Sequence, residues 1–242
     1  MCAILAPPPV SSTRLLITPE NGVMRSVVLP ARSRPVYKPI ELQRSLRLLG
    51  WPIRVDGVVG ERTAQAVRDF QRGFAFATLV AGGGVGPRTL EALRMAIRRG
   101  GRCSQHFTFR SFRSPGDGWI KLDRALVRGL ERYRATLGEP VVVLAGHRDA
   151  DWNAAHGGAT DSQHLLGTAA DLEPAMTVDE VHALRVFSGI GYERETGLVR
   201  HVDVRHCGPQ SGGATVAHPA VWALASGASG AHRPALGQTG RP

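Results

Sequence analysis

Two histidines and an aspartate have the types and spacing of a metal site. His164 and Asp171 lie in the segment 162–171, and His201 follows further along the chain. Two neutral imidazoles and one carboxylate suit Zn²⁺ and leave a fourth position open for water. Zinc held in this way lowers the pKa of water toward about 7 and polarises a carbonyl group as a Lewis acid. The residue types therefore predict a hydrolytic zinc centre.

A carboxylate stands close to the last of these histidines. Asp203 follows His201 by two residues, in a stretch from Val199 to Arg205 in which apolar and polar residues alternate. Such alternation is typical of a half-buried strand, where residues i and i+2 lie on the same face. His201 can then bind the metal while Asp203 transfers protons. Asp203 is therefore the predicted general acid/base.

The elements that must carry these residues alternate between helix and strand. Apolar residues at helical spacing predict a helix over 122–137 and a second helix over 178–187. The apolar run 141–144 predicts a buried strand between them. Residues 104–207 are thus predicted to form an α+β domain with a central antiparallel sheet.

Residues 38–97 contain an internal repeat. The segment 59–67 returns 26 residues later as 85–93, and in each copy a Gly precedes a helix start. A third apolar pattern over 40–49 predicts another amphipathic helix, which ends at Gly50. Together these helices predict a small bundle of about 60 residues, near the lower limit for independent folding.

The positions that mark the repeat also follow a known pattern. They are Leu42, Gln43, Leu48, Leu49, Gly50, Val55, Asp56, Gly57, Gly60, Thr63, Ala66, Val67, Phe70, Gln71, Val85, Gly86, Pro87 and Thr89. This order resembles the peptidoglycan-binding domain of many cell-wall hydrolases. The resemblance departs from the family at 81–84, where Ala-Gly-Gly-Gly replaces a second Asp-Gly. It implies a three-helix module that binds peptidoglycan.

The segments around the predicted metal site follow a second known pattern. Its positions are Gly146, His147, Arg148, Asn153, Ala154, Ala155, Gly157, Gly158, Ser162, His164, Gly167, Ala169, Ala170, Asp171, Gly189, Ile190, Gly191, His201, Val202 and Asp203. This order resembles the zinc D-Ala-D-Ala peptidase family, whose members are carboxypeptidases and endopeptidases of peptidoglycan. The family shares the metal-site fold of hedgehog signalling domains. The resemblance covers about residues 106–206.

The second resemblance implies roles for individual residues. His164, Asp171 and His201 match the zinc ligands. Arg148 matches the arginine that faces the substrate carbonyl or terminal carboxylate, and a planar guanidinium with a permanent charge suits that task. Ser162 is implied to form a hydrogen bond near the substrate.

Two registers remain open for the third ligand. Many relatives place an acid three residues before the last zinc histidine, and Leu198 occupies that position here. In the first register His201 is the ligand and Asp203 is the base. In the second, Asp203 and His206 form an acid-x-x-His pair, which also occurs in this family, and His201 is accessory. We favour the first register because His206 has the opposite strand parity.

Composition bounds the partners of the chain. The net charge of +10 is carried almost entirely by arginine and predicts acidic partners, such as cell wall or nucleic acid. No helix-turn-helix or base-stacking motif accompanies the charge, so a nucleic-acid partner is not predicted. No run approaches the roughly 20 apolar residues of a membrane span. Three cysteines, far apart, make no disulfide framework. We expect a monomer.

The two ends of the chain are predicted to lie outside the domains. Residues 1–37 are broken by prolines and are expected to form an irregular leader or linker. Residues 208–242 are rich in Gly, Ala, Ser and Pro and are expected to form a flexible tail, from which Val221 and Trp222 can dock on the preceding domain. The apolar run 1–6 is too short for a secretory signal, which fits a phage lysin released at lysis, or another export route.

These observations together predict a zinc-dependent peptidase that cuts stem peptides or cross-links of peptidoglycan at the cell wall. They leave the choice between carboxypeptidase and endopeptidase open. The second hypothesis is a non-catalytic zinc protein that binds cell wall. Against it stands the open ligand set beside Asp203 and Arg148, because structural zinc usually has four protein ligands. A third hypothesis, nucleic-acid binding, rests on charge alone.

Overall fold

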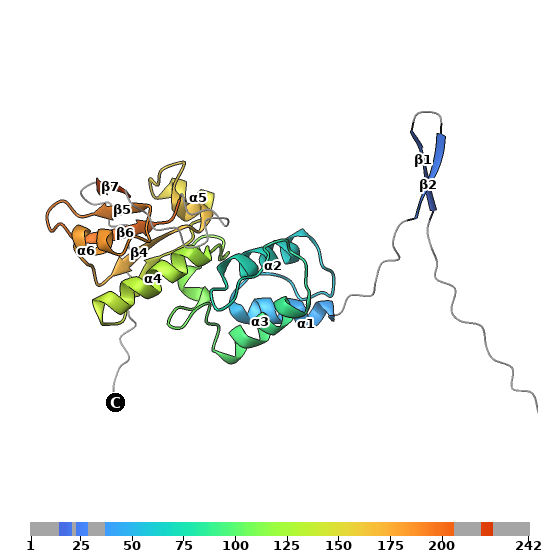
Figure 1. Ribbon diagram of the computed structural model, residues 1–242, viewed down its shortest axis with the longest axis horizontal. Helices are drawn as coiled ribbons and strands as arrows, with labels where there is room; N and C mark the ends of the chain where they lie inside the picture. The colour runs from blue at the N-terminus through green and yellow to red at the C-terminus, as the bar shows by residue number, and fades with distance from the viewer. Residues whose placement is uncertain (1–14, 21–22, 29–36, 206–218, 225–242) are drawn as a thin grey trace, which may run out of the picture. The chain divides into compact units, whose positions relative to one another are not determined.

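The computed structural model describes residues 15–20, 23–28, 37–205 and 219–224 of the chain. The chain divides into two units, Met1–Val36 and Tyr37–Pro242. In the first unit β1 (Leu15–Glu20) and β2 (Val23–Val28) pair as an antiparallel hairpin, drawn in Figure 1. We expected an irregular leader here. The overlooked signal is Asn-Gly at 21–22 between two apolar runs, a dipeptide that favours a two-residue hairpin turn.

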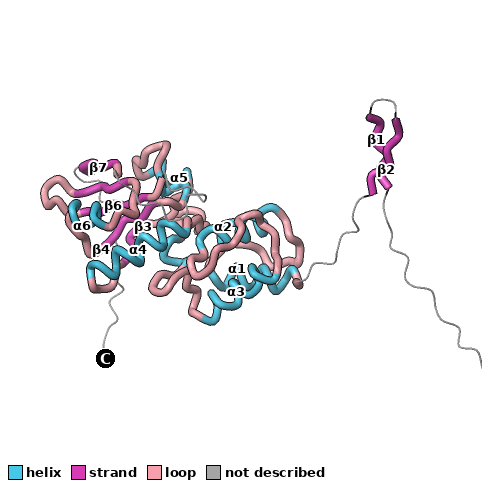
Figure 2. The backbone as a smooth tube through the Cα atoms, in the orientation of Figure 1, coloured by secondary structure: helices cyan, strands magenta, loops and turns pink. Residues whose placement is uncertain are grey.

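Three helices form the first part of the second unit, as the repeat predicts (Figure 2). They are α1 (Pro39–Leu49), α2 (Glu61–Gly73) and α3 (Pro87–Arg98). Proline opens α1 and α3, where the first helical N–H has no partner to lose. Each helix turns one apolar stripe inward, and the buried side chains include Leu42, Leu46, Leu49, Ala66, Val67, Phe70, Ala92, Leu93 and Ala96.

Two glutamines hold the loops of the repeat in the same way. The carboxamide of Gln43 accepts a hydrogen bond from the backbone N–H of Gly57 at 2.8 Å and donates to Val58 O at 2.9 Å. The carboxamide of Gln71 accepts from the N–H of Gly83 at 3.0 Å and donates to Gly84 O at 2.7 Å. The second loop is therefore held as the first one is, although it lacks the Asp-Gly of the family pattern.

A mixed five-stranded sheet forms the second part of this unit and confirms the predicted α+β class. Its strand order is β3-β4-β6-β5-β7. Neighbouring strands are antiparallel except that β7 lies parallel to β5 at one edge. The strands are β3 (Val142–Ala145), β4 (Ala169–Glu173), β5 (Gly189–Tyr192), β6 (Val199–Asp203) and β7 (Ala220–Ala223).

Short helices and one long helix surround the sheet (Figure 1). The long helix, α4 (Arg124–Leu137), buries Leu126, Leu130 and Tyr133. The hydroxyl of Tyr133 accepts a hydrogen bond from the N–H of Met176 at 2.8 Å. Phe187 packs closely against the same helix at Gly129, which has no side chain to displace it. The helices are η1 (Phe109–Phe112), α4 (Arg124–Leu137), α5 (Ala150–Ala155), η2 (Gln163–Leu166) and α6 (Val178–Ala183).

The strand predicted as buried is an edge strand. β3 pairs with β4 alone, and its side chains Val142 and Leu144 are 56% and 39% exposed. A short apolar run does not reveal whether a strand is central or at an edge, because both can satisfy the same pattern. The prediction of a strand at this position is correct, and the prediction of its burial is wrong.

The helical bundle and the sheet domain share one hydrophobic core. The ring of Trp51, which follows α1, lies 5.1 Å from Phe109 of η1 and 6.3 Å from Phe70 of α2 between centroids. The indole N–H of Trp51 donates to Ile120 O at 3.1 Å. The indole N–H of Trp119, in the sheet domain, donates a hydrogen bond to Asp69 of α2 at 2.9 Å.

An arginine adds polar contacts to this interface. The guanidinium of Arg124, at the start of α4, donates to the carbonyl oxygens of Gln71, Arg72 and Leu79 at 3.1, 3.3 and 2.7 Å. These acceptors all belong to α2 or to the chain that follows it. The bundle is therefore packed onto the sheet domain through buried groups and is not tethered to it by a free linker.

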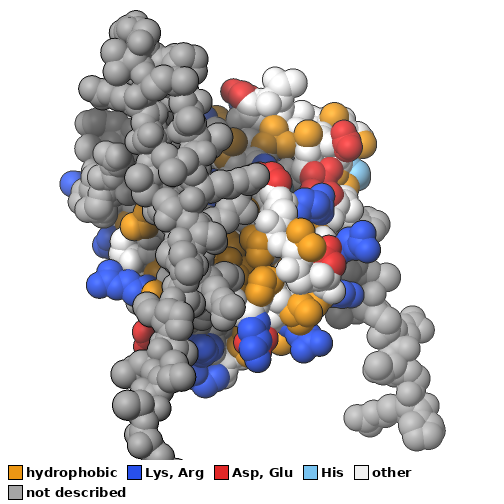
Figure 3. Space-filling model, turned by 90° about the vertical axis from the view of Figure 1, so that its right-hand side faces the viewer, with side chains coloured by type: hydrophobic (Ala, Val, Ile, Leu, Met, Phe, Trp, Pro, Cys, Tyr) orange, Lys and Arg blue, Asp and Glu red, His pale blue; other side chains and the backbone are white. Residues whose placement is uncertain are grey.

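Basic side chains are spread over the part of one face that Figure 3 shows. In Figure 3, Lys and Arg side chains of the visible face alternate with hydrophobic and acidic ones and do not form one continuous patch. This distribution agrees with a solvated basic surface. Among the described residues, no helix combines the length and apolar character needed to cross a membrane.

We predict that the bundle and the sheet domain unfold in one cooperative transition. Trp51 is 1% exposed and contacts both parts, so Trp51→Ala removes packing from both and lowers the free energy of unfolding by about 3–5 kcal/mol. Leu48→Ala in the neighbouring helix is the control, because Leu48 is 63% exposed and a change of about 0.5 kcal/mol or less is expected. Urea denaturation followed by fluorescence and by circular dichroism measures both. Two separate transitions in the wild type would contradict the shared core.

Candidate metal site

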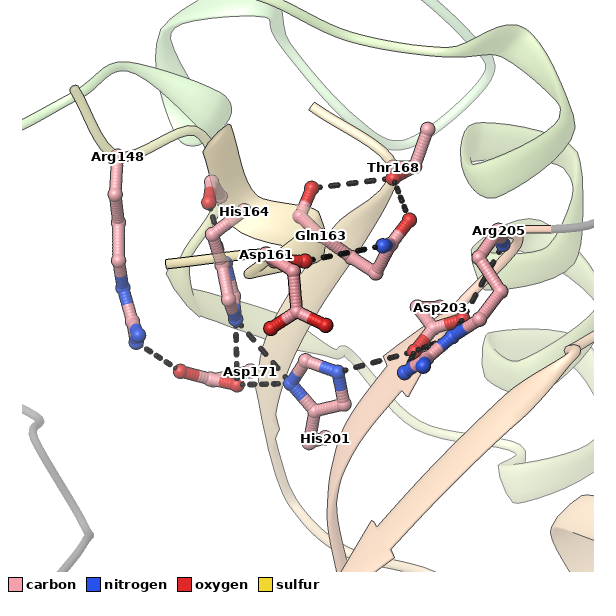
Figure 4. A network of polar contacts seen from close by, with 10 residues as sticks. Arg148, Asp161, Gln163, His164, Thr168, Asp171, His201, Asp203 and Arg205 are labelled. Carbon is pink, nitrogen blue, oxygen red and sulfur yellow. Dashed lines mark hydrogen bonds and ion pairs between the residues drawn. The ribbon is translucent and has the colours of Figure 1, made fainter. Parts of the chain in front are cut away.

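Three ligand-type side chains converge on one face of the sheet. The Nε2 atom of His164 lies 3.2 Å from Asp171 Oδ1 and 3.2 Å from His201 Nδ1, and the last two atoms are 2.9 Å apart. Figure 4 shows the three groups pointing toward one another. One ligand atom from each lies within 4.8 Å of the others. The structure thus brings together the three residues that the sequence predicts as zinc ligands.

Sheet register places two of these residues side by side. Asp171 on β4 is the direct partner of His201 on β6. On β4 the residues Ala170 and Leu172 point into the core, and alternation along the strand turns Asp171 to the opposite face. His164 reaches the same point from η2, the short turn that precedes β4.

A hydrogen bond to the main chain determines which ring nitrogen of His164 is free to bind a metal. Its Nδ1–H donates to Gly146 O at 2.6 Å, so Nε2 is the nitrogen left for a metal. The carbonyl oxygen of His164 in turn accepts the ring N–H of His147 at 2.9 Å and the backbone N–H of Arg148 at 3.1 Å. A histidine that binds a metal usually donates its other ring N–H to an oxygen, which sets the tautomer and the ring orientation.

The ring nitrogen of His201 that points away from His164 and Asp171 faces a carboxylate. Its Nε2 lies 3.5 Å from Asp203 Oδ2, and the side chain of Asp203 is 0% exposed. Arg205 approaches both oxygens of Asp203, with Nε at 3.0 and 3.1 Å. Asp203 is therefore enclosed between an imidazole and a guanidinium.

The electrostatics of the cluster favour charged carboxylates. Burial acts to raise the pKa of Asp171, but the contacts from His164 and His201 outweigh it and hold that pKa well below its ordinary value. Asp203 behaves alike: burial raises its pKa, and the contacts from His201 and Arg205 lower it further than burial raises it. Burial lowers the pKa of His164, which keeps the neutral imidazole that a metal requires.

Arg148 completes the polar network on the other side of Asp171. Its Nη2 forms an ion pair with Asp171 Oδ2, and its guanidinium carbon lies 5.5 Å from the ring centroid of Trp152. Its Nε is buried without a hydrogen-bond partner. Arg148 therefore reaches the ligand cluster and retains an unused donor, while its predicted role at the substrate stays a prediction.

Two other residues are predicted to belong to the site, and the structure describes only one of them. Ser162 directly precedes η2, is partly buried and makes no side-chain cap to that turn. His206 lies outside the described residues. The contacts of His201 support the first register, with His201 turned to His164 and Asp171. The assignment of ligands stays a prediction.

The donor set fits a zinc ion. Two imidazole nitrogens and one carboxylate oxygen converge, and both imidazoles have their second nitrogen directed at an oxygen. The sequence did not reveal three supporting groups: the carbonyl of Gly146, the guanidinium of Arg205 and the indole of Trp222. A carbonyl carries no side-chain signal, Arg205 contacts Asp203 only two residues away but its residue type does not mark it, and the place of Trp222 depends on strand register. The docking of residues 221–222 was the only signal for Trp222.

Comparison with known proteins agrees with this geometry. Residues 98–208 match the sequence model of the Peptidase M15 family, and residues 38–93 match that of a peptidoglycan binding domain. The chain is also 29% identical over 146 residues to the zinc D-Ala-D-Ala carboxypeptidase of Streptomyces albus G. That alignment covers 54% of this chain and 56% of the relative, so the chain spans about half the length of this curated protein. The chain is thus similar over residues 98–208 to the Peptidase M15 family and over residues 38–93 to a peptidoglycan binding domain.

Proposed function

We propose that the protein is a zinc-dependent peptidase that hydrolyses peptide bonds in the stem peptides or cross-links of peptidoglycan. The observation that carries this proposal is the convergence of His164, Asp171 and His201, each ligand atom within 4.8 Å of the others. Three protein ligands leave a coordination position open, as in catalytic zinc sites. The family match and the name of the relative support the substrate class.

The chain's own residues divide the work around the metal. When bound, zinc supplies Lewis acidity and lowers the pKa of water at its open position. His164 and His201 hold the ion through neutral nitrogens, and Asp171 contributes negative charge. Arg148, with a buried Nε that has no partner, binds the substrate carbonyl or a terminal carboxylate through its planar donors. Ser162 adds a hydrogen bond at the substrate.

The peptidoglycan-binding domain directs this site to the wall. Binding to an insoluble substrate raises the effective concentration of the catalytic site at its bonds. The shared core around Trp51 fixes the bundle to the peptidase domain, so both bind the wall as one body. We propose action at the cell wall, outside the cytoplasm or after delivery by a phage. Release of a terminal D-Ala and cleavage of cross-links are both compatible with the site.

A non-catalytic zinc protein is the alternative. Such a protein needs a saturated ion, typically with four protein ligands. In the described part of the chain the cluster contains three residues of ligand type. The positively charged side chain of Arg148, which can bind a substrate oxygen, lies beside it. These features favour catalysis.

Digestion of purified peptidoglycan tests the proposed function. The full-length protein is incubated with walls in the presence of zinc or of a chelator, and the soluble and insoluble products are identified by mass spectrometry. Free D-Ala identifies a carboxypeptidase, and loss of cross-linked dimers identifies an endopeptidase. Absence of any new product with zinc-loaded, folded protein would reject the peptidase.

We predict one bound zinc per chain, held by the three converging residues. His164→Ala and His201→Ala each remove one of three protein ligands, so zinc content falls from one to below about a tenth per chain and hydrolysis is lost with it. His182→Ala is the matched control, because His182 is exposed at the end of α6. Metal analysis after dialysis measures the content. If His201→Ala keeps its zinc, the third ligand lies elsewhere and the second register is favoured.

Asp203 has two candidate roles, general acid/base and orientation of His201, which an experiment can separate. The sequence predicts a general acid/base. The contacts favour a different role, because Arg205 approaches both carboxylate oxygens and Asp203 Oδ2 faces the outward nitrogen of His201. A carboxylate held in this way, with a lowered pKa, is a weak proton acceptor but orients an imidazole well. We therefore propose that Asp203 orients His201.

Asp203→Ala distinguishes the two roles. If Asp203 orients His201, the dissociation constant for zinc rises about 10–100-fold and the loss of turnover follows from metal loss. If Asp203 is the acid/base, zinc binds as in the wild type and turnover falls about 100-fold or more at saturating zinc. Chelator competition and initial rates are measured on the same preparations, and thermal melting verifies that the variant is folded.

A further inference from the structure

The C-terminal strand β7 brings an aromatic side chain to the metal site. Asp171 pairs with His201, His201 pairs with Gly191, and Gly191 pairs with Trp222 across β4, β6, β5 and β7. Residues directly opposite each other on paired strands lie on the same face of a sheet. Trp222 therefore stands on the face that carries Asp171 and His201, in the same row across the sheet.

Gly191 leaves the space through which Trp222 reaches His201. A Cβ atom at Gly191 would lie 3.2 Å from Trp222 Nε1 and 3.1 Å from His201 Cβ, which is closer than most such contacts. With no side chain between them, the indole and the imidazole approach to 5.4 Å between centroids, at an interplanar angle of 55°. An aromatic contact thus forms across a strand.

Trp222 also contacts the group that holds the carboxylate behind His201. The guanidinium carbon of Arg205 lies 5.2 Å from the Trp222 ring, within the range of a cation–π interaction. Arg205 pairs with Asp203, and Asp203 faces His201 Nε2. The four side chains therefore form a closed ring of contacts, in which two independent partners restrain the His201 imidazole.

We propose that Trp222 is a positioning residue for the metal site. It holds the imidazole of His201 with Nδ1 directed at His164 and Asp171, and it screens the Asp203–Arg205 pair from water, which strengthens that pair. The inference rests on the proposed role of His201 as a ligand. Residues 219–224 lie beyond the segment 98–208 that matches the peptidase family, so the family match gives Trp222 no role.

Zinc affinity of full-length variants tests this proposal without an activity assay. A chromogenic chelator competes for zinc with the wild type, Trp222→Ala, Trp222→Phe and Val221→Ala. Trp222→Ala is expected to raise the zinc dissociation constant about 10-fold, the lower end of the effect of outer partners on metal affinity. Trp222→Phe keeps an aromatic face and stays within about 3-fold of the wild type. Val221→Ala is the matched control on the same strand, since Val221 is 45% exposed and the next side chain along a strand points to the other face.

A second readout separates positioning from loss of the strand. The visible absorption of Co²⁺ bound in place of zinc reports ligand geometry, and Trp222→Ala is expected to change it while Val221→Ala does not. Equal zinc affinity in the wild type and Trp222→Ala overturns the proposal. It is also overturned if Trp222→Phe and Val221→Ala weaken binding as much as Trp222→Ala does. If His201→Ala binds zinc as tightly as the wild type, the proposed ligand itself has failed, and that result is independent of residue 222.

Discussion

The site depends on the electrostatic contacts that the Asp171 carboxylate makes with its neighbours. Its carboxylate lies against the imidazoles of His164 and His201 and the guanidinium of Arg148. Without that negative charge, a partly buried arginine and two polar rings would face one another with no compensation, which is energetically unfavourable. Asp171 can take this place because β4 is flanked by β3 and β6, and its neighbours Ala170 and Leu172 anchor the strand in the core.

Strong local patterns account for the parts of the fold that the sequence predicted. Helical spacing with terminal Gly or Pro located α1, α3 and α4, and alternation located β6. Local patterns do not show which strands lie side by side. The exposure of Val142 follows from the edge position of β3, and the order of strands decides that position. For the same reason the parallel pairing of β7 with β5 could not be derived from residues 220–223.

The candidate site shows the same division between local and long-range information. His164 and Asp171 share one segment, and His201 was grouped with them first by residue type and then by the family resemblance. Two groups outside that segment orient these ligands: Gly146 O, which directly follows β3, and Asp203, which lies two residues after His201 on β6. The contact of His164 with Gly146 O depends on long-range folding, which residue types alone do not determine, whereas Asp203 is placed beside His201 by local alternation along β6.

The shared core between the bundle and the sheet domain limits how the two can act. A flexible linker lets a catalytic domain search a wide volume around a bound module. Here the contacts of Trp51 and Arg124 leave no such freedom, because a buried ring and three carbonyl acceptors would have to separate first. A bundle that binds the wall therefore holds the metal site at a fixed distance from the point of attachment. Under the proposed function, the bonds within reach are then set by the geometry of the wall around that point, and moving to new bonds requires the bundle to detach and bind again.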